Sequence, residues 1–326
     1  MDVTFLTEQQ IWGDDRGNGQ LQVMKGYGTK AGMSDLAIAL GGLVRNDKTS
    51  DGQRSGPVWS ASSDDDGNVR TVHYGGDRVI YGPDNRVLAA RPALPSSVTS
   101  PIRTSVASSS KKNSGVDVVE YGEYPQTIAP EAVNKALEQA FKAGKLQATG
   151  KKYTFDSEGL YAYDQPFKAK EYEAYQHNGK RYIRFEAKPI DNHPVLSNGH
   201  TPELGEACWI EVQPIEWLVD PSGVWVARQA LFSGVQFDKK QNYDGKFDKT
   251  DMKHYLDTYF SKEMLASRGI DTPAPPRVTH SGFGGRSGHA TQARFGRPLS
   301  GDIITLVRTL KRRSPKSSAL RRGRNA

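Results

Sequence analysis

Apolar and polar positions change their spacing several times along the chain, and each change predicts a different element. Residues 33–42 place a capping serine before an apolar run that stops at Gly41 and Gly42, which predicts a helix. From Pro57 onward the apolar positions come in short runs separated by turn residues, which predicts a meander of strands. The expected strands are residues 58–62, 69–74, 78–81 and 86–90.

A second patterned stretch begins at residue 118. Residues 130–143 carry Val133, Leu137 and Phe141 on one face, which predicts an amphipathic helix. The dipeptide Asn-Gly at 178–179 separates two aromatic-rich runs and is a strong hairpin signal. Strands are expected over residues 172–176 and 180–185, with further strands at 207–219 and 224–228 around an Asp-Pro-Ser-Gly turn, followed by a helix over residues 250–265.

Composition divides the chain into four segments. Residues 1–95 hold the first helix and the meander, residues 96–117 form a Ser-rich linker, and residues 118–268 form the second folded block. Residues 269–326 have too little apolar surface to offset the entropy of ordering, so we expect a disordered tail with at most one or two helical turns at 303–310. The fold class that these patterns predict is α+β, with short antiparallel strands and a few helices.

Charge is unevenly distributed between the body and the tail. The 326 residues carry a formal net charge of +7. Residues 269–326 contain twelve Lys or Arg and two Asp, so the tail is +10 and the rest of the chain is −3. A basic tail on a mildly acidic body indicates an appendage that meets an anion, or a solvated end, rather than a basic DNA-binding fold.

Several classes of protein do not fit the sequence. One cysteine makes neither an internal disulfide nor a Cys-rich zinc site. No apolar run is long enough to span a membrane, and the N-terminus lacks the basic and apolar regions of a secretory signal. We therefore expect a protein without a membrane span, in the cytoplasm or associated with a virion.

Motifs for known enzyme chemistry are missing from the sequence. It contains no phosphate-binding loop, dinucleotide fingerprint, nucleophile elbow or paired-histidine zinc motif. Cys208 lies in an alternating strand, which favours a buried structural thiol. Residues 64–68 (Asp-Asp-Asp-Gly-Asn) are typical of an Asx-type turn, with a calcium loop as the alternative. We assign no catalytic residue, metal site or cofactor, and an enzyme of unrecognised type stays a third hypothesis.

Two groups of motifs resemble the formylglycine-generating-enzyme/C-type-lectin-like domains of bacterial and phage proteins. The first is Gly-Pro-Val-Trp-Ser-Ala-Ser at 56–62 with Ala-Arg-Pro-Ala-Leu at 90–94. The second is Val-Glu-Tyr-Gly-Glu-Tyr-Pro-Gln at 119–126, with Pro-Ile-Glu-Trp-Leu-Val-Asp at 214–220 and Ala-Leu-Phe-Ser-Gly at 230–234. In the family the Tyr-Gly-x-Tyr-Pro-Gln motif opens the domain, Ile-x-Trp-x-Val is a central strand, and Arg-Pro-Ala-Leu closes it. Here the order is reversed, so the chain is either a circularly permuted domain or two half-like domains.

The resemblance also implies what the protein does. The oxygenases of this family use a pair of cysteines, which this chain lacks, so the implied activity is recognition of a protein or glycan. In similar proteins diversified by retroelements, the binding residues precede the closing motif. The matching residues here are Trp59, Ser60, Ser62, Asp64, Asp65, Asn68, Arg70, His73, Tyr74, Asp77, Arg78, Tyr81, Asn85 and Arg86.

Two alternatives stay open beside this hypothesis. The polar residues of the meander are equally expected on the outer face of an ordinary antiparallel sheet, with Trp59 and Tyr81 in the core. The protein is alternatively a phage or particle component whose tail contacts nucleic acid or an acidic partner, through weak, salt-sensitive attraction to phosphate. The tail residues concerned are Lys311, Arg312, Arg313, Lys316, Arg321, Arg322 and Arg324.

Overall fold

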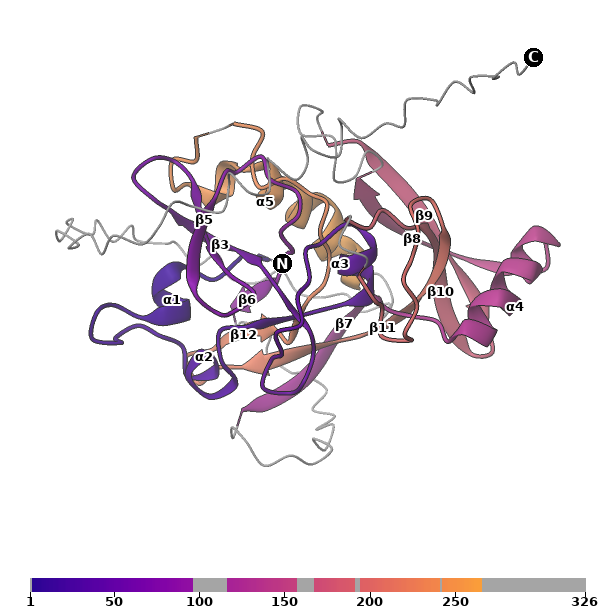
Figure 1. Ribbon diagram of the computed structural model, residues 1–326, viewed down its shortest axis with the longest axis horizontal. Helices are drawn as coiled ribbons and strands as arrows, with labels where there is room; N and C mark the ends of the chain where they lie inside the picture. Colours follow the sequence, from indigo (N-terminus) through magenta and orange to yellow (C-terminus); the bar gives the residue numbers. More distant parts are fainter. Residues whose placement is uncertain (1, 96–115, 157–166, 191–193, 241, 266–326) are drawn as a thin grey trace, which may run out of the picture. The chain divides into compact units, whose positions relative to one another are not determined.

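The computed structural model describes residues 2–95, 116–156, 167–190, 194–240 and 242–265 (Figure 1). Their helices are α1 (Glu8–Trp12), α2 (Gln22–Tyr27), α3 (Asp35–Ala39), α4 (Glu131–Lys142), η2 (Phe247–Lys249), α5 (Asp251–Tyr255), η3 (Leu256–Phe260) and α6 (Ser261–Leu265). Their strands are β1 (Ala31–Met33), β2 (Ser55–Gly56), β3 (Val58–Ser63), β4 (Val69–Val72), β5 (Arg78–Tyr81), β6 (Ala93–Pro95), β7 (Asp117–Ile128), β8 (Gln147–Asp156), β9 (Ala169–His177), β10 (Lys180–Glu186), β11 (Ala207–Val219), β12 (Val224–Ala227) and β13 (Gln229–Ala230). The fold is α+β with mostly antiparallel strands, as the sequence predicts.

The largest sheet is organised around the long strand β11. Its strands follow the order β6-β12-β11-β10-β9-β8, and β7 also pairs with β11. β7 runs antiparallel to residues 210–219 along one edge of β11, while β10 and β12 pair with the two ends of the other edge. Register shifts at 211/212 and 214/216 mark bulges in the middle of β11, where Pro214 has no amide hydrogen to donate.

Residues before and after the Ser-rich segment share sheets. β6 pairs with β12 at the end of the large sheet, and β1 pairs in parallel with β13 and antiparallel with β2. The described residues all belong to one compact unit. The two blocks that composition separates are therefore built into each other.

Most expected elements are present, with shifted ends. The helix expected at 33–42 is α3, which is shorter; Ser34 caps it by accepting a hydrogen bond from the backbone N–H of Ala37 at 3.0 Å. β3, β4 and β5 match three of the four expected meander strands. The fourth, at 86–90, is wrong: these residues make only isolated bridges, and the strand β6 begins at Ala93. The helix expected at 250–265 is interrupted by the π-helical turn η3.

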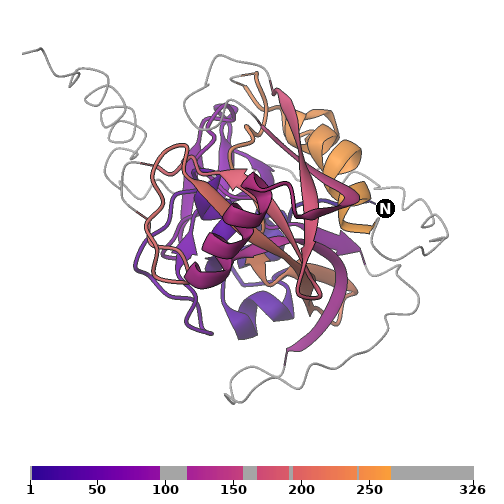
Figure 2. The ribbon, with the colours of Figure 1, turned by 90° about the vertical axis from the view of Figure 1, so that its right-hand side faces the viewer.

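Aromatic side chains fill the core between the sheet and the C-terminal helices. Tyr124 packs against Phe260 with ring centroids 5.0 Å apart, and Phe232 packs against Tyr255 at 4.9 Å. Helix α4 lies on the sheet (Figure 2), and a smaller hydrophobic cluster that includes Leu137 of α4 and Trp209 of β11 is buried there. Cys208 of β11 is buried, and burial raises the pKa of its thiol to about 12, so it is not a thiolate at neutral pH.

Candidate functional site

The predicted recognition residues lie on and around the three-stranded sheet β3-β4-β5. In this antiparallel meander Arg70 of β4 pairs with Ile80, and Val72 pairs with Arg78 of β5. Because side chains alternate along a strand, Arg70 and Arg78 project from the same face, while Val69 and Thr71 project from the other. Val69 and Thr71 are buried, and so is Val72 on the arginine side, but the side chains of Arg70 and Arg78 reach solvent there.

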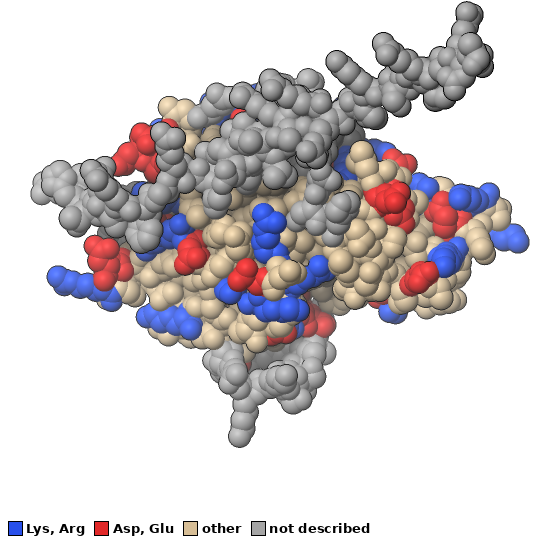
Figure 3. All heavy atoms as spheres, viewed as in Figure 1, with Lys and Arg blue, Asp and Glu red and all other residues tan. Residues whose placement is uncertain are grey.

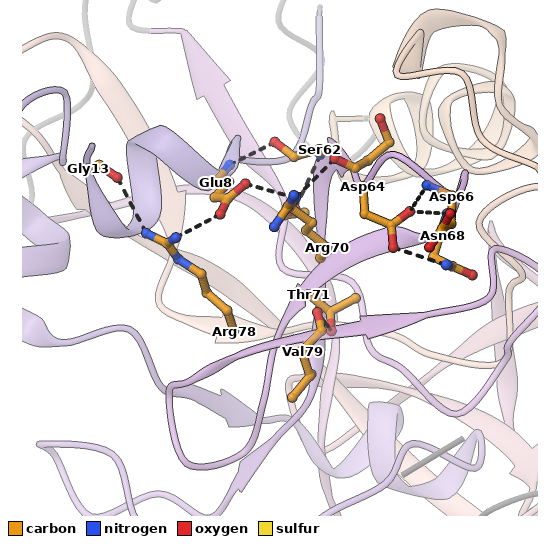
Figure 4. Close-up of polar contacts among 12 residues, drawn as sticks. Glu8, Gly13, Ser62, Asp64, Asp66, Asn68, Arg70, Thr71, Arg78 and Val79 are labelled. Atoms are coloured by element: carbon orange, nitrogen blue, oxygen red, sulfur yellow. Dashed lines mark hydrogen bonds and ion pairs between the residues drawn. The ribbon is translucent and has the colours of Figure 1, made fainter. Parts of the chain in front are cut away.

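Helix α1 places a carboxylate between these arginines. Thr7 caps the helix and forms a reciprocal capping box with Gln10, which fixes where the helix starts. The backbone N–H of Glu8 donates to Ser62 Oγ at 2.9 Å, which ties the helix to β3. Glu8 then contacts Arg70 Nε through Oε2 and Arg78 Nη1 through Oε1, both at 3.0 Å (Figure 4).

Trp12, at the end of the same helix, holds the second arginine. The guanidinium of Arg78 lies over the Trp12 ring, 5.2 Å from its centroid, and Trp12 Nε1 donates to the carbonyl of Gly76 at 3.1 Å. Two guanidinium groups thus share one carboxylate beside an aromatic ring, and a positive charge remains. We call the group Glu8, Trp12, Ser62, Arg70 and Arg78 the arginine face. The side chains of Arg70 and Arg78 are 34% and 45% exposed, so a ligand can reach them.

The turn between β3 and β4 is an Asx-type turn, as the sequence favours. Asp64 Oδ1 accepts hydrogen bonds from the backbone N–H of Asp66 and of Asn68, and its Oδ2 accepts from the Asn68 side chain (Figure 4). These internal donors occupy the carboxylate oxygens that a calcium ion would need. Among the residues that the structure describes, no group of three or more His, Cys, Asp or Glu is placed to hold a metal ion.

The other end of the meander carries two aromatic rings. The ring centroids of His73 and Tyr74 lie 3.6 Å apart, and the guanidinium of Arg45 lies 5.7 Å from the Tyr74 ring centroid. Desolvation by burial lowers the pKa of His73 below 6.5, although the carboxylate of Asp77 opposes this. His73 is therefore neutral at neutral pH, and this end is suited to stacking and hydrogen bonding.

Four of the predicted ligand-binding side chains lie in the core and not on the surface. Trp59 packs against Phe237 with centroids 5.2 Å apart, and Ser60 donates to the carbonyl of Arg70. Tyr81 is 4% exposed, and Arg86 is buried in an ion pair with Asp156. A ligand on the surface therefore cannot contact these four side chains. For Trp59 and Tyr81 this is the core position that the ordinary-sheet alternative predicted. The ten that reach the surface, wholly or in part, are Ser62, Asp64, Asp65, Asn68, Arg70, His73, Tyr74, Asp77, Arg78 and Asn85.

The basic residues predicted for nucleic-acid contact, from Lys311 to Arg324, lie outside the described residues. On the face shown in Figure 3, acidic and basic side chains of the folded unit are interspersed. No helix within the described ranges is long and apolar enough to cross a membrane.

A second feature has no counterpart in the sequence analysis. A polar cavity of about 380 Å³ opens at the bulged middle of β11. It is lined by Gln53, Glu120, Gln126, Glu211, Gln213, Pro214, Glu216, Arg228 and Gln229. These residues come from distant segments of the chain, and their spacing matches no known motif. The only sequence feature that pointed to such a cavity was the Gln and Glu content of strands β7 and β11. The lining holds carboxylates but no histidine.

Comparison with known proteins identifies no relative of this chain. No protein-family model matches the chain, and neither the curated proteins nor the solved structures contain a match.

Proposed function

We propose that this protein is a non-enzymatic recognition module with a C-type-lectin-like fold, which binds a protein or glycan ligand at the arginine face. The observation that carries the proposal is that Arg70 and Arg78 share the single carboxylate of Glu8. The arrangement is held before any ligand arrives, because Arg78 stacks on Trp12 and α1 is tied to β3. Arginine and tryptophan are the residues that most often dominate binding energy at interfaces.

The free hydrogen-bonding capacity of the face defines its ligand. Within the described residues, the Nη groups of Arg70 make no hydrogen bond, since its contacts to Ser63 and Glu8 both use Nε. Guanidinium groups with unused donors bind carboxylates and other planar anions in a two-pronged geometry. The ligand we expect therefore presents an acidic group, as an acidic glycan or an acidic protein segment does.

The lectin-like fold is supported by where the motifs lie. The Arg-Pro-Ala-Leu motif at 90–94 runs into β6, which pairs with β12, and the motif at 119–126 forms most of β7 on the other edge of β11. The closing motif and the opening motif therefore lie in the same sheet, with β12 and β11 between them, although the chain has them in reverse order. This is the arrangement that a circular permutation produces, because permutation changes connections and preserves packing.

Binding by the full chain to an array of sialylated, uronic-acid-containing and neutral glycans, and to immobilised acidic peptides, tests the proposal. We expect the double substitution R70Q/R78Q to weaken binding to the best acidic probe by at least about tenfold, because charge-assisted hydrogen bonds are lost. R16Q is the matched control, since Arg16 is an exposed arginine of the loop after α1. Equal binding by the wild type and the double variant would overturn the proposal, and so would an equal loss in R16Q.

The particle-component alternative predicts a different pattern. In that case removal of residues 269–326 abolishes assembly or retention of DNA, while R70Q/R78Q has no effect on either.

A further inference from the structure

The polar cavity lies where β11 lacks regular pairing on one edge. β10 ends its pairing at Glu211 and β12 begins its pairing at Trp217, so residues 212–216 of that edge have no strand partner within the described chain. The volume, about 380 Å³, is within the range of small-molecule sites. Its lining is dominated by amide and carboxylate groups, which excludes a predominantly apolar ligand.

Part of the lining is a fixed framework. The side-chain amide of Gln126 donates from Nε2 to the carbonyls of Gln213 and Pro214, both at 2.9 Å, and its Oε1 accepts from Gln229 Nε2 at 2.8 Å. Gln126 is 4% exposed, and its amide satisfies two backbone carbonyls of the bulged stretch. The framework holds the wall of the cavity in place and leaves no N–H of the Gln126 side chain for a ligand.

The one arginine of the lining is already neutralised. Arg228 Nε donates to Asp51 Oδ2 at 3.0 Å, and its Nη1 is paired with Glu216. Lys180 likewise pairs with Glu211, at 2.9 Å from Oε1. An anionic ligand therefore finds no unused cation in the lining.

Two acceptors in the lining are unused. The carboxylate of Glu120 makes no hydrogen bond or ion pair with any described residue. Gln53 Oε1 is buried and accepts no hydrogen bond in the described structure, which is costly unless a donor reaches it. Its position depends on Gly32, since a Cβ there would lie 1.9 Å from this oxygen. The lining as a whole has three Glu side chains against one Arg.

From these observations we infer that the polar cavity is a second binding site, and that its ligand is a small organic cation with several N–H donors, namely an alkylguanidinium or alkylammonium group. A metal ion is a poorer fit, because no described cluster of three His, Cys, Asp or Glu side chains is placed to hold one. The cation pairs with the carboxylate of Glu120. Gln53 Oε1 is closed to solvent as it lies, so the Gln53 side-chain amide has to turn toward the cavity for this oxygen to accept an N–H from the cation. The same group occurs in free small molecules and in the basic side chains of peptides, and the experiment separates the two sources.

The test is calorimetric titration of the full chain with n-butylguanidinium and with its neutral isostere n-butylurea. A peptide arm uses acetyl-Gly-Arg-Gly-amide and the same peptide with citrulline in place of arginine. We expect saturable binding of the guanidinium probe in at least one arm, and at least about tenfold weaker binding of its neutral isostere. Binding in the peptide arm alone identifies a peptide-borne side chain as the ligand, and binding of n-butylguanidinium identifies a site that accepts the free cation.

Substitutions locate the binding. E120Q keeps the shape of the side chain and removes its charge, so we expect binding at least about tenfold weaker than in the wild type. E203Q is the matched control, because Glu203 is exposed and lies outside the cavity lining. Q53M removes the buried acceptor at similar volume and provides a second variant should E120Q fold poorly. Equal affinity for the charged and neutral probes, no binding in either arm, or unchanged binding in both E120Q and Q53M would overturn the inference. R70Q/R78Q is expected to bind the guanidinium probe normally, so this inference and the proposed function can fail independently.

Discussion

Arg70 and Arg78 come from adjacent strands of one hairpin, whereas Gln53, Glu120 and Arg228 reach the polar cavity from three segments far apart in the sequence. The arginine face needs only the register of β4 with β5 and a short helix placed against it. The cavity needs β7 paired with β11 and β1 paired with β13. A face formed by neighbouring strands is visible as a pattern in the sequence, while a cavity formed by long-range pairing is not. The same difference predicts which substitutions act locally and which act on the whole fold.

The largest expected effect is at Arg86, the predicted surface residue that the fold buries. Arg86 and Asp156 are 0% and 2% exposed, and their pairing joins the end of the meander to β8. R86L leaves a buried carboxylate without its main cation, so we expect the free energy of unfolding to fall by about 3–5 kcal/mol. Urea denaturation measures the change.

Arg78, a partly exposed arginine of the same meander, provides the control for that prediction. R78L removes a partly exposed arginine and is expected to cost about 1 kcal/mol or less. R86L/D156L removes both buried charges and should recover much of the stability lost in R86L. A cost of R86L equal to that of R78L would contradict the assignment of Arg86 to the core.

A smaller effect is expected at Asp51, which holds Arg228 beside the cavity. Burial opposes ionisation of Asp51, but hydrogen bonds from Thr49 and Tyr27 and the charge of Arg228 outweigh it and lower its pKa below 3.8. D51N is expected to lower the free energy of unfolding by about 1 kcal/mol at neutral pH, after allowance for solvent screening. A lowered folded-state pKa gives stability that is present above about pH 4 and is lost as the pH falls through the folded value.

The measurement is the free energy of unfolding of the wild type and of D51N between pH 2 and pH 6. The advantage of the wild type should shrink as the pH falls below about 4, because protonated Asp51 then resembles asparagine. D15N is the control, since Asp15 is exposed and makes no hydrogen bond or ion pair with any described residue. A difference between wild type and D51N that stays constant over this range would show that the charge of Asp51 is not what holds Arg228.

The smallest effect is expected in the turn at 64–68. D64A removes three internal hydrogen bonds from a surface turn that water can replace, so we expect a loss of about 0.5–1.5 kcal/mol. D65A is the matched control, because Asp65 is exposed and has no described partner. Thermal unfolding with and without calcium completes the test: a calcium-dependent rise in Tm that D64A abolishes would show a calcium loop here instead of an Asx turn.

Local patterns predicted the meander because its signals are local. Turn residues separate β3, β4 and β5, and the alternation in β4 distinguishes the arginine side from the buried side. The pattern did not predict that Arg86 is buried, because its partner Asp156 is 70 residues away in the sequence. It also did not predict α1, since five residues carry too little periodicity to identify a helix, and so Glu8 and Trp12 were missed from the face.

The sequence by itself determined the α+β class, the meander, the amphipathic helix α4 and the distribution of charge between body and tail. Each of these follows from short-range spacing, capping or composition, which the chain carries wherever it folds. Only the tertiary structure decided which polar side chains are buried, that α1 supplies one carboxylate to two arginines, and that a bulge in β11 opens a polar cavity. These depend on pairings between distant strands, and the free energy of burying or pairing a side chain is set by those neighbours.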